Sequence, residues 1–519
     1  MSGEWTLGKT VTLVLSLCAW ACGGTKHSFS SQSRTLRMAV EGRMEGYALA
    51  RTRNFYEANF STLVFEGLTK IDDQGRVEPS LARRWEVSPD GRVYRFTLRS
   101  GVRFHDGSGF GAADVPRAWE QALREPRVGD RHAWMLDNIV GADAIAPGSL
   151  APLTGVRAVD DTTLEVRLVH RLTRFPAQLG ETQAFIGAAS SDDAHPVGTG
   201  PWRWVRGAAT ADEILLVRNP GYWGRPPKLD SLVVVVLPDS DLVDAFASGA
   251  VDCTVDMTRA SRIALAARPD IRLNASGAPG MVRIVFNLRM PVLRELRVRR
   301  ALVLALDRQR LAQEAAAGAV IHANGPLPRG TLGFDSLHVG ARYDPAEASR
   351  LLLEARFPFD QPLRIVMPSV ATPEFSADFS NLLQTYWRAV GVRVLPWDST
   401  STSQPDLDLR ISYPESADPD AYLYSRFHSR VAGMAGNKGG FADAIVDQLL
   451  DRGRQESDPA VRARLMREAS DRIDDLVANI FLWFAPVLTA SSTRLNGCVG
   501  GGPTSKYLDV DLAGAGHTP

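Results

Sequence analysis

Residues 65–119 constrain the fold of this chain more than any other stretch, because short apolar segments alternate there with strong turn signals. The sequences DQG at 73–75 and SPDG at 88–91 are typical of turns, since their glycines can adopt the positive φ that such turns require. The sequence RVYRFTLR at 92–99 is close to the alternation of a half-buried strand. Asp114 is then expected to cap an amphipathic helix. By itself, the stretch predicts a small α+β module.

The same stretch carries several sequence motifs in a fixed order. They are E-G-L at 66–68, P-x-L-A-x-x-W-E-x-S-x-D-G at 79–91, L-R-x-G-V-x-F-H-D-G at 98–107 and A-x-D-V at 112–115. Farther along lie G-T-G-P-W at 198–202, N-P-G-Y-W at 219–223, S-G-x-V-D at 248–252 and V-R-x-A-L-x-x-A-L-D-R at 298–308. In this order the motifs resemble the extracytoplasmic solute-binding proteins of peptide ABC transporters, the family of the oligopeptide- and dipeptide-binding proteins (solute-binding family 5).

That resemblance implies an α/β fold like that of the periplasmic binding proteins. Two lobes would lie around a ligand cleft, with an extra small α+β module inserted in the first lobe. The implied divisions are a signal peptide at 1–21, a lipidated tether at 22–34, a first part of lobe I at 35–77, the inserted module at 78–190, a second part of lobe I at 191–277, lobe II at 278–488 and a C-terminal return to lobe I at 489–519.

Outside the module, the sequence predicts an alternation of strands and helices. Residues 156–166 are expected to form a strand–turn–strand hairpin. The apolar run 232–237, mostly valine, is typical of a strand buried on both faces. Residues 363–395 predict a strand, a helix and a second strand, and therefore a parallel crossover. A long helix is expected to begin at Asp458 and to carry its core face as far as Ile480.

The charge balance argues against one large class of function. Lys and Arg together number 59, as do Asp and Glu together, so the formal net charge is zero. A nucleic-acid-binding protein usually carries a basic face, so no nucleic-acid partner is expected. The hydrophobic fraction of 45% is typical of globular proteins and allows a sizeable core.

The N-terminus has the pattern of an export signal. Lys9 precedes an apolar run at 11–21, which is too short to span a bilayer comfortably and suits the core of a signal peptide. The run ends in Ala-Cys-Gly-Gly at 21–24, which resembles a bacterial lipoprotein processing site. We therefore expect Cys22 to be lipidated and the protein to be anchored to a membrane in the periplasm or cell envelope. Cleavage and release without lipid is the alternative, and either route means export.

Two cysteines remain beyond the predicted lipidation site, Cys253 and Cys498. In an oxidising compartment they could form a disulfide. Two buried thiols are the alternative, since sequence alone does not fix the geometry that a disulfide needs. Both outcomes stay open.

The sequence contains no persuasive catalytic motif. H-E-x-x-H, C-x-x-C, G-x-S-x-G and the P-loop are all missing, and the nine histidines show no metal-ligand spacing. We therefore expect no enzyme activity, no cofactor and no metal site. His105 lies in a turn motif of the family, where local hydrogen bonding is its expected role.

The candidate ligand-binding residues centre on the acidic segment 413–422, YPESADPDAY. In peptide-binding members of the family, an Asp three residues before a D-P or E-P dipeptide pairs with the ligand's α-ammonium, and the resemblance puts Glu415 at that position. The alternative is that Glu415 is a solvated loop acid. Tyr413 stands where a tryptophan often precedes the motif, and Asp418 is a further candidate, although capping of the next turn is its favoured role. Trp134 is a candidate wall residue of the cleft, with core packing as its alternative.

Together these features predict the extracytoplasmic substrate-binding component of an ABC importer, which binds peptides as its two lobes close. Its expected partners are the solute, the ABC permease subunits in the inner membrane and the membrane itself through the lipid, and the protein is expected to be a monomer. Two alternatives stay open. Relatives with this fold bind nickel chelates, haem or oligosaccharides, and a ligand sensor for a membrane receptor would have the same architecture.

Overall fold

The computed structural model describes residues 34–40, 55–72, 76–125, 134–192, 194–207, 212–255, 257–316, 320–367, 377–398, 400, 404–412, 418–433, 436–496 and 507–512. All of them belong to one unit of the chain, Arg34–Pro519, and none belongs to the other, Met1–Ser33. The predicted signal peptide, Cys22 and the turn at 73–75 therefore lie outside the described residues.

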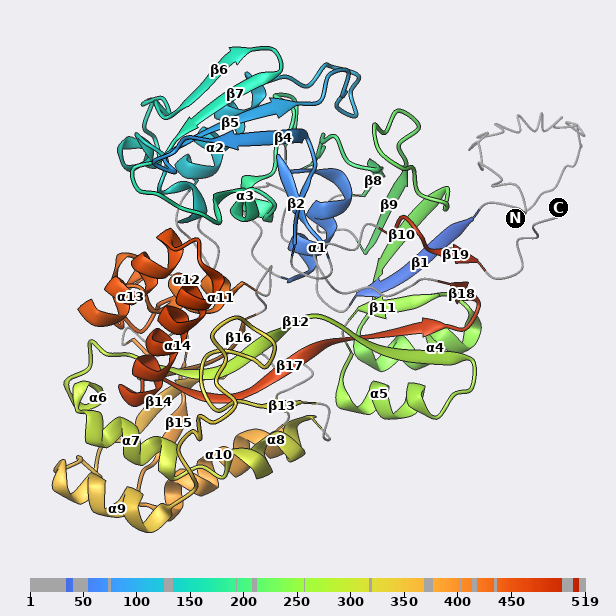
Figure 1. Cartoon of the computed structure of the whole chain (residues 1–519). Coiled ribbons are helices and arrows are strands. Elements are labelled where there is room, and N and C mark those ends of the chain that lie inside the picture. The colour runs from blue at the N-terminus through green and yellow to red at the C-terminus, as the bar shows by residue number, and fades with distance from the viewer. Residues whose placement is uncertain are drawn as a thin grey trace, which may run out of the picture. The chain divides into compact units, whose positions relative to one another are not determined.

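A mixed β-sheet organises the described part of the chain (Figure 1). Its strands follow the order β15-β14-β16-β12-β17-β11-β1-β10-β9-β8, and β13 pairs with β17. Their bounds are β1 (Thr35–Val40), β8 (Trp202–Arg206), β9 (Glu213–Arg218), β10 (Ser231–Val236), β11 (Cys253–Val255), β12 (Ile271–Phe286), β13 (Ile321–His322), β14 (Leu363–Val366), β15 (Val394–Pro396), β16 (Leu407–Ser412) and β17 (Asn479–Ser492). Several neighbouring strands, such as β17 and β11 or β11 and β1, thus come from distant parts of the sequence.

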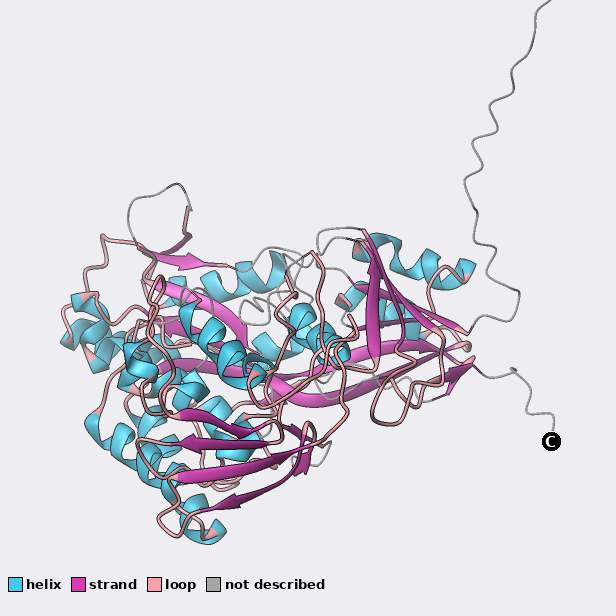
Figure 2. Ribbon diagram, turned by 90° about the horizontal axis from the view of Figure 1, so that it is seen from above, coloured by secondary structure: helices cyan, strands magenta, loops and turns pink. Residues whose placement is uncertain are grey.

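Two long strands, β12 and β17, connect the two ends of this sheet (Figure 1). They pair antiparallel, with a register shift between Ser276 and Gly280. On one side of the shift β17 also pairs with β11, and on the other side β12 pairs with β16. Figure 2 shows the same long ribbons from above. The strand pair therefore joins two separately packed ends, and the first of its two register shifts lies between them.

Helices cover both ends of the sheet, and further helices pack elsewhere in the described part of the chain, α2 and α3 in a separate core. They are α1 (Phe55–Val64), α2 (Asp114–Arg124), α3 (Phe175–Gln178), α4 (Asp239–Ser248), α5 (Arg259–Ala266), α6 (Pro291–Arg294), α7 (Leu296–Leu304), α8 (Arg308–Ala316), α9 (Pro345–Glu354), α10 (Ala377–Ala389), α11 (Pro419–Tyr422), α12 (Tyr424–Phe427), α13 (Ala444–Gln455) and α14 (Pro459–Asp475). One core packs β12, β14 and β16 against α7, α9 and α10, with Trp387 and Trp483 fully buried in it. Another packs β1, β9 and β10 against α1.

A third core is built from buried residues between Leu68 and Ala188, and we call this part of the chain the module. Its sheet has the order β4-β5-β7-β6, and α2 contributes Trp119 to the core. The strands are β4 (Ala82–Val87), β5 (Val93–Leu98), β6 (Val156–Asp160) and β7 (Thr163–Arg167). Two further pairs of short strands lie elsewhere, β2 (Thr69–Ile71) with β3 (Val77–Pro79) and β18 (Leu495–Asn496) with β19 (Asp511–Leu512).

The predicted elements of the module are mostly confirmed. The hairpin expected at 156–166 is β6 and β7, which pair antiparallel. The expected cap of α2 is wrong, because Asp114 is the first residue of the helix. Its Oδ2 accepts a hydrogen bond from the backbone N of Gly111 at 3.0 Å, so the side chain closes the preceding turn instead.

The predictions outside the module also hold in part. The apolar run 232–237 forms β10, whose first four residues are buried, and 363–395 supplies the parallel pair β14–β15 with α10 between them. Asp458 caps α14 through the backbone N–H groups of Ala460 and Val461. The helix ends earlier than expected, at Asp475, because Val477 adopts a positive φ of 47°. Ile480 therefore lies in β17.

The helices α11, α12, α13 and α14 share a core with parts of β12 and β17, and we call these four helices the helical cluster. Its elements lie below the module in Figure 1. Cys253 is buried at the start of β11. Cys498 lies outside the described residues, so its pairing with Cys253 stays a prediction.

Candidate ligand cleft and its closing seam

Three of the sequence motifs meet at one buried carboxylate, that of Glu66. It accepts hydrogen bonds from Thr199 Oγ1 at 3.0 Å, Tyr222 OH at 2.8 Å and Trp223 Nε1 at 2.7 Å. Burial and the neighbouring Glu66 raise the pKa of Tyr222 above its ordinary value, so its hydroxyl stays a donor. The motifs E-G-L, G-T-G-P-W and N-P-G-Y-W thus form one internal hydrogen-bonded junction. Their role in this junction is structural.

His105 ties a fourth motif to the same junction. Its Nε2 lies 2.9 Å from the carbonyl oxygen of Gly200, and its Nδ1 lies 3.4 Å from the backbone N of Gly198. Burial lowers the pKa of His105, which favours a neutral ring that donates from Nε2 and accepts at Nδ1. The predicted hydrogen-bonding role is found, but the partners of the ring lie 95 and 93 positions away, so the bonds are not local to the turn. A Cβ at Gly198 would collide with the carbonyl oxygen of Val64, so the glycine is needed for close packing.

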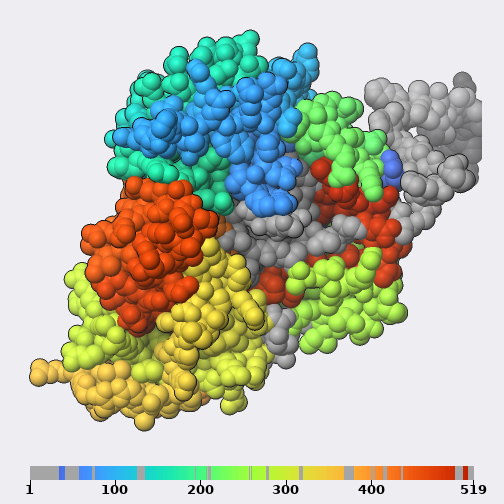
Figure 3. Space-filling model, viewed as in Figure 1, coloured from blue at the N-terminus to red at the C-terminus, as the bar shows by residue number. Residues whose placement is uncertain are grey.

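The module and the helical cluster bond to each other along a line of contact that we call the seam. Arg174 Nε donates to Asp418 Oδ2 at 3.0 Å. The adjacent Thr173 donates from its backbone N to the carbonyl of Arg454 at 3.2 Å and from its hydroxyl to the carbonyl of Glu456 at 3.0 Å. These carbonyls lie at the C-terminal end of α13, where a helix leaves acceptors unsatisfied. In the space-filling view the two surfaces meet (Figure 3).

Buried charges support the seam from the helical side. Arg462 donates from Nη2 to Asp418 Oδ1 at 2.8 Å and from Nη1 to Asp418 Oδ2 at 3.2 Å. Burial acts to raise the pKa of Asp418, but Arg462 and Arg174 outweigh it, so the pKa lies below its ordinary value. Asp420 pairs with Arg454 at 3.2 Å, and burial together with the charge of Asp418 raises the pKa of Asp420.

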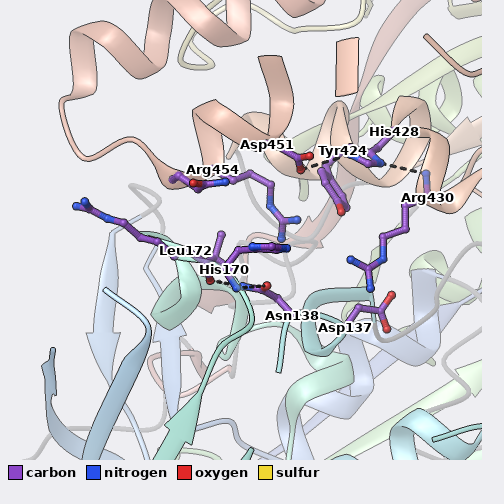
Figure 4. A pocket seen from close by; sticks show the side chains of 11 residues that line it. Asp137, Asn138, His170, Leu172, Tyr424, His428, Arg430, Asp451 and Arg454 are labelled. Atoms are coloured by element: carbon purple, nitrogen blue, oxygen red, sulfur yellow. Dashed lines mark hydrogen bonds and ion pairs between the residues drawn. The ribbon is translucent and has the colours of Figure 1, made fainter. Parts of the chain in front are cut away.

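A pocket of about 170 Å³ opens along the seam, with walls from both sides. Tyr424 lines it, with the Arg454 guanidinium 3.8 Å from the ring centroid and the His428 ring 4.4 Å away (Figure 4). His170 comes from the module. Asp451 lies 3.3 Å from His428 Nε2, and although burial acts to raise the pKa of Asp451, the contact with His428 helps to hold it below its ordinary value. The pocket walls therefore carry charges of both signs.

The predicted site residues are only partly described. Glu415 and Tyr413 lie outside the described residues, so their ligand roles stay predictions. Trp134 begins a short 3-10 helix, Trp134–Leu136, and its side chain is also outside the description. Asp418 is the N-cap of α11 and accepts from the backbone N of Asp420 at 3.0 Å, which is the role favoured from the sequence.

Sequence reasoning missed Arg174 and Arg462, the two arginines that hold Asp418. No motif or spacing marks them, because they lie 244 and 44 positions from Asp418. Only the fold brings them to it. Within the described part of the chain, no group of three or more His, Cys, Asp or Glu side chains could hold a metal ion. No described helix is long and apolar enough to cross a membrane.

The sequence comparison decides the family. The family model for the bacterial extracellular solute-binding proteins, family 5 Middle, matches residues 76–434. This chain belongs to that family. The match includes most of the module, the Arg174–Asp418 contact and the acidic segment that contains Glu415, and it ends before Arg454, Glu456 and Arg462 of the seam.

Relatives of this family 5 protein are similar over most of its length. The di/tripeptide-binding protein 2 of Pseudomonas aeruginosa (strain UCBPP-PA14) is 26% identical over 474 residues, covering 85% of this chain and 88% of the relative. Heme-binding protein A of Haemophilus influenzae is 27% identical over 431 residues, covering 76% of each.

A solved structure is similar in fold. It is the ABC transporter-associated periplasmic binding protein DppA from Helicobacter pylori in complex with the peptide STSA. Its TM-score is 0.80 at 20% identity, over 92% of this chain and 98% of that chain. This family 5 protein therefore has the two-lobe α/β fold of the periplasmic binding proteins, and the predictions of family and fold class are confirmed.

Proposed function

We propose that this family 5 protein is the peptide-binding component of an ABC importer. The observation that carries the proposal is the carboxylate of Glu415, three residues before the Asp418-Pro419 cap of α11. The motif of peptide-binding relatives has an acidic residue at this place. The similarity to a di/tripeptide-binding protein over 85% of this chain adds support.

The proposed mechanism is closure of two lobes around the peptide. The carboxylate of Glu415 pairs with the peptide's α-ammonium, and the pair strengthens as the closing lobes exclude water. The peptide backbone is held by main-chain hydrogen bonds, as an added strand would be. Such binding depends little on side chains and suits the uptake of mixed peptides. Tyr413 and Trp134 would line the same cleft.

The proposed division of the chain keeps the boundaries expected from the sequence. The module belongs to lobe I, the helical cluster belongs to lobe II, and β12 and β17 pass between the lobes. Cys22 carries the lipid that anchors the protein at the periplasmic face of a membrane, where it meets the permease as a monomer. No catalytic step is involved.

A non-peptide solute is the second candidate. Heme-binding protein A of Haemophilus influenzae is as similar in sequence as the peptide-binding relative, at 27% against 26% identity. A pocket formed by the same fold can therefore take a different ligand, and Glu415 would then have no ammonium to meet.

Native mass spectrometry of protein purified from its own host tests the proposal. We expect bound masses that correspond to short peptides and that disappear after partial unfolding and refolding. Bound haem, a nickel chelate or an oligosaccharide, with no peptide, would contradict it. Peptide binding without any transport defect on deletion of the neighbouring permease would instead favour a sensor.

A further inference from the structure

Asp418 is held by two arginines that come from different sides of the seam. Arg462 belongs to the helical cluster, bonds both carboxylate oxygens, and its side chain is 7% exposed. Arg174 belongs to the module, bonds only Oδ2, and its side chain is 33% exposed. Separation of the module from the helical cluster would therefore affect the two ion pairs of Asp418 differently.

Separation would break the pair with Arg174 and keep the pair with Arg462. Asp418 would then still have a cation, so opening would not leave a buried carboxylate unpaired, which is strongly unfavourable. Arg462 also fixes the carboxylate before Arg174 arrives, because its own side chain is anchored by a hydrogen bond from Nε to the carbonyl of Gly453 at 3.2 Å. The Arg174 contact is thus both pre-organised and reversible.

Thr173 makes an independent contact of the same kind. Its hydroxyl donates to the carbonyls of Arg454 at 3.1 Å and Glu456 at 3.0 Å, at the end of α13. These acceptors can bond water when the seam is apart, so this contact is also reversible. Two neighbouring residues of the module therefore bond the helical cluster through one ion pair and a set of uncharged hydrogen bonds.

We propose that Thr173, Arg174 and Asp418 form a latch that holds the cleft closed and sets how long a bound solute stays. The inference rests on the proposed closure of two lobes, and it concerns positioning residues that need not touch the solute. Asp418 follows Glu415 by three residues, so the latch acts on the segment proposed to meet the ligand. Each contact made only in the closed form shifts the open–closed equilibrium toward it and slows release.

The test compares Arg174→Met and Thr173→Val with a matched control, Arg167→Met. Arg167 is an arginine of β7 whose Nε bonds Glu165 at 3.3 Å within the module, with its side chain 64% exposed. Stopped-flow release of a fluorescent tripeptide should be roughly fivefold faster in Arg174→Met and in Thr173→Val, as expected for loss of a contact worth about 1 kcal/mol. Arg167→Met should release at the wild-type rate, and Arg174→Lys should recover part of the loss because it keeps the charge.

A second measurement needs no ligand. Small-angle X-ray scattering of the ligand-free proteins should show a larger radius of gyration in Arg174→Met and Thr173→Val than in Arg167→Met. If the radii are equal, faster peptide release from Arg174→Met and Thr173→Val still supports the latch. Equal radii and equal release rates in all three variants would overturn the latch. If no variant and no wild-type protein binds the tripeptide, the peptide proposal fails, and scattering alone decides the latch, with equal radii counting against it.

Discussion

Trp223 donates its indole Nε1 hydrogen to the carboxylate of Glu66 across 2.7 Å, although the two residues are 157 positions apart in the sequence. Arg99 lies over the same indole, 4.5 Å from the ring centroid. The contact brings together motifs that the sequence shows only as separate stretches. It indicates that much of what marks the family in this chain is an internal junction, distinct from the segment that is proposed to bind the solute.

The junction predicts a large effect of Glu66→Leu on stability. Leucine has a similar size but accepts no hydrogen bond, so the donors of Thr199, Tyr222 and Trp223 would lose their acceptor. Leaving such donors unsatisfied should lower the free energy of unfolding by about 2–4 kcal/mol, measured by urea denaturation. Glu66→Gln should cost less, because its amide oxygen can still accept from Trp223 and the Tyr222 hydroxyl can turn.

Glu78 supplies the matched control. It lies in β3, and its side chain is 41% exposed in a surface ion pair with Lys70. Glu78→Leu should change the free energy of unfolding by no more than about 0.5 kcal/mol. Equal losses for Glu66→Leu and Glu78→Leu would contradict the role of the junction.

His338, which lies in a loop before α9 and contacts α14, predicts a pH dependence. His338 Nε2 lies 2.9 Å from Asp474 Oδ2, and Nδ1 lies 3.7 Å from Asp471 Oδ1. The hydrogen bond with Asp474, with added attraction from Asp471 and Asp475, raises the pKa of His338 above its ordinary value. A raised folded-state pKa contributes stability that is fully present below the unfolded-state pKa of about 6.5 and is lost as the pH rises through the folded-state pKa.

The measurement compares wild type with His338→Gln across pH. The free energy of unfolding should differ more between the two proteins near pH 5.5 than near pH 9, where the imidazole is neutral in both states. Parallel stability curves at all pH values would show that the contact with Asp474 does not depend on the charge of His338.

The N-terminal sequence predicts a lipid on Cys22. Cys22→Ser should abolish acylation and release the protein from the membrane fraction, since a thiol is needed to carry the lipid. Cys18→Ser is the control and should leave acylation unchanged, because Leu17 makes Cys18 a poorer processing site. Intact-mass analysis of both proteins checks the prediction, and wild-type acylation of the Cys22→Ser protein would rule it out.

The sequence predicts best those elements whose pattern is local. The valine run of β10 and the hairpin of β6 and β7 depend on neighbouring residues alone, and both are found. α14 ends where Val477 adopts a positive φ, which valine rarely does. The sequence does not reveal this break, because the apolar pattern continues past it to Ile480 in β17. The observed position of Asp114 differs from the predicted cap by one residue, because an acidic side chain is favoured both at the cap and at the first helical residue.

The candidate site is less predictable, for a different physical reason. Asp418 could be recognised as a cap because Pro419 and Asp420 follow it directly. Its arginine partners could not, since Arg174 and Arg462 are two among many arginines and reach Asp418 only through the packing of the module on the helical cluster. Contacts of this kind depend on topology, which local patterns do not encode.

The central claim is that Glu415 meets the α-ammonium of a peptide, and a calorimetric cycle tests it most directly. The cycle measures wild type, Glu415→Gln and a control, Glu468→Gln, each with a tripeptide and with its N-acetylated form. Glu468 is an acid on α14 whose side chain is 51% exposed. Wild type and Glu468→Gln should lose about 2–5 kcal/mol of binding free energy on acetylation, whereas Glu415→Gln should barely distinguish the two peptides. Equal losses on acetylation in all three proteins, or full affinity of Glu415→Gln for the free peptide, would contradict the claim.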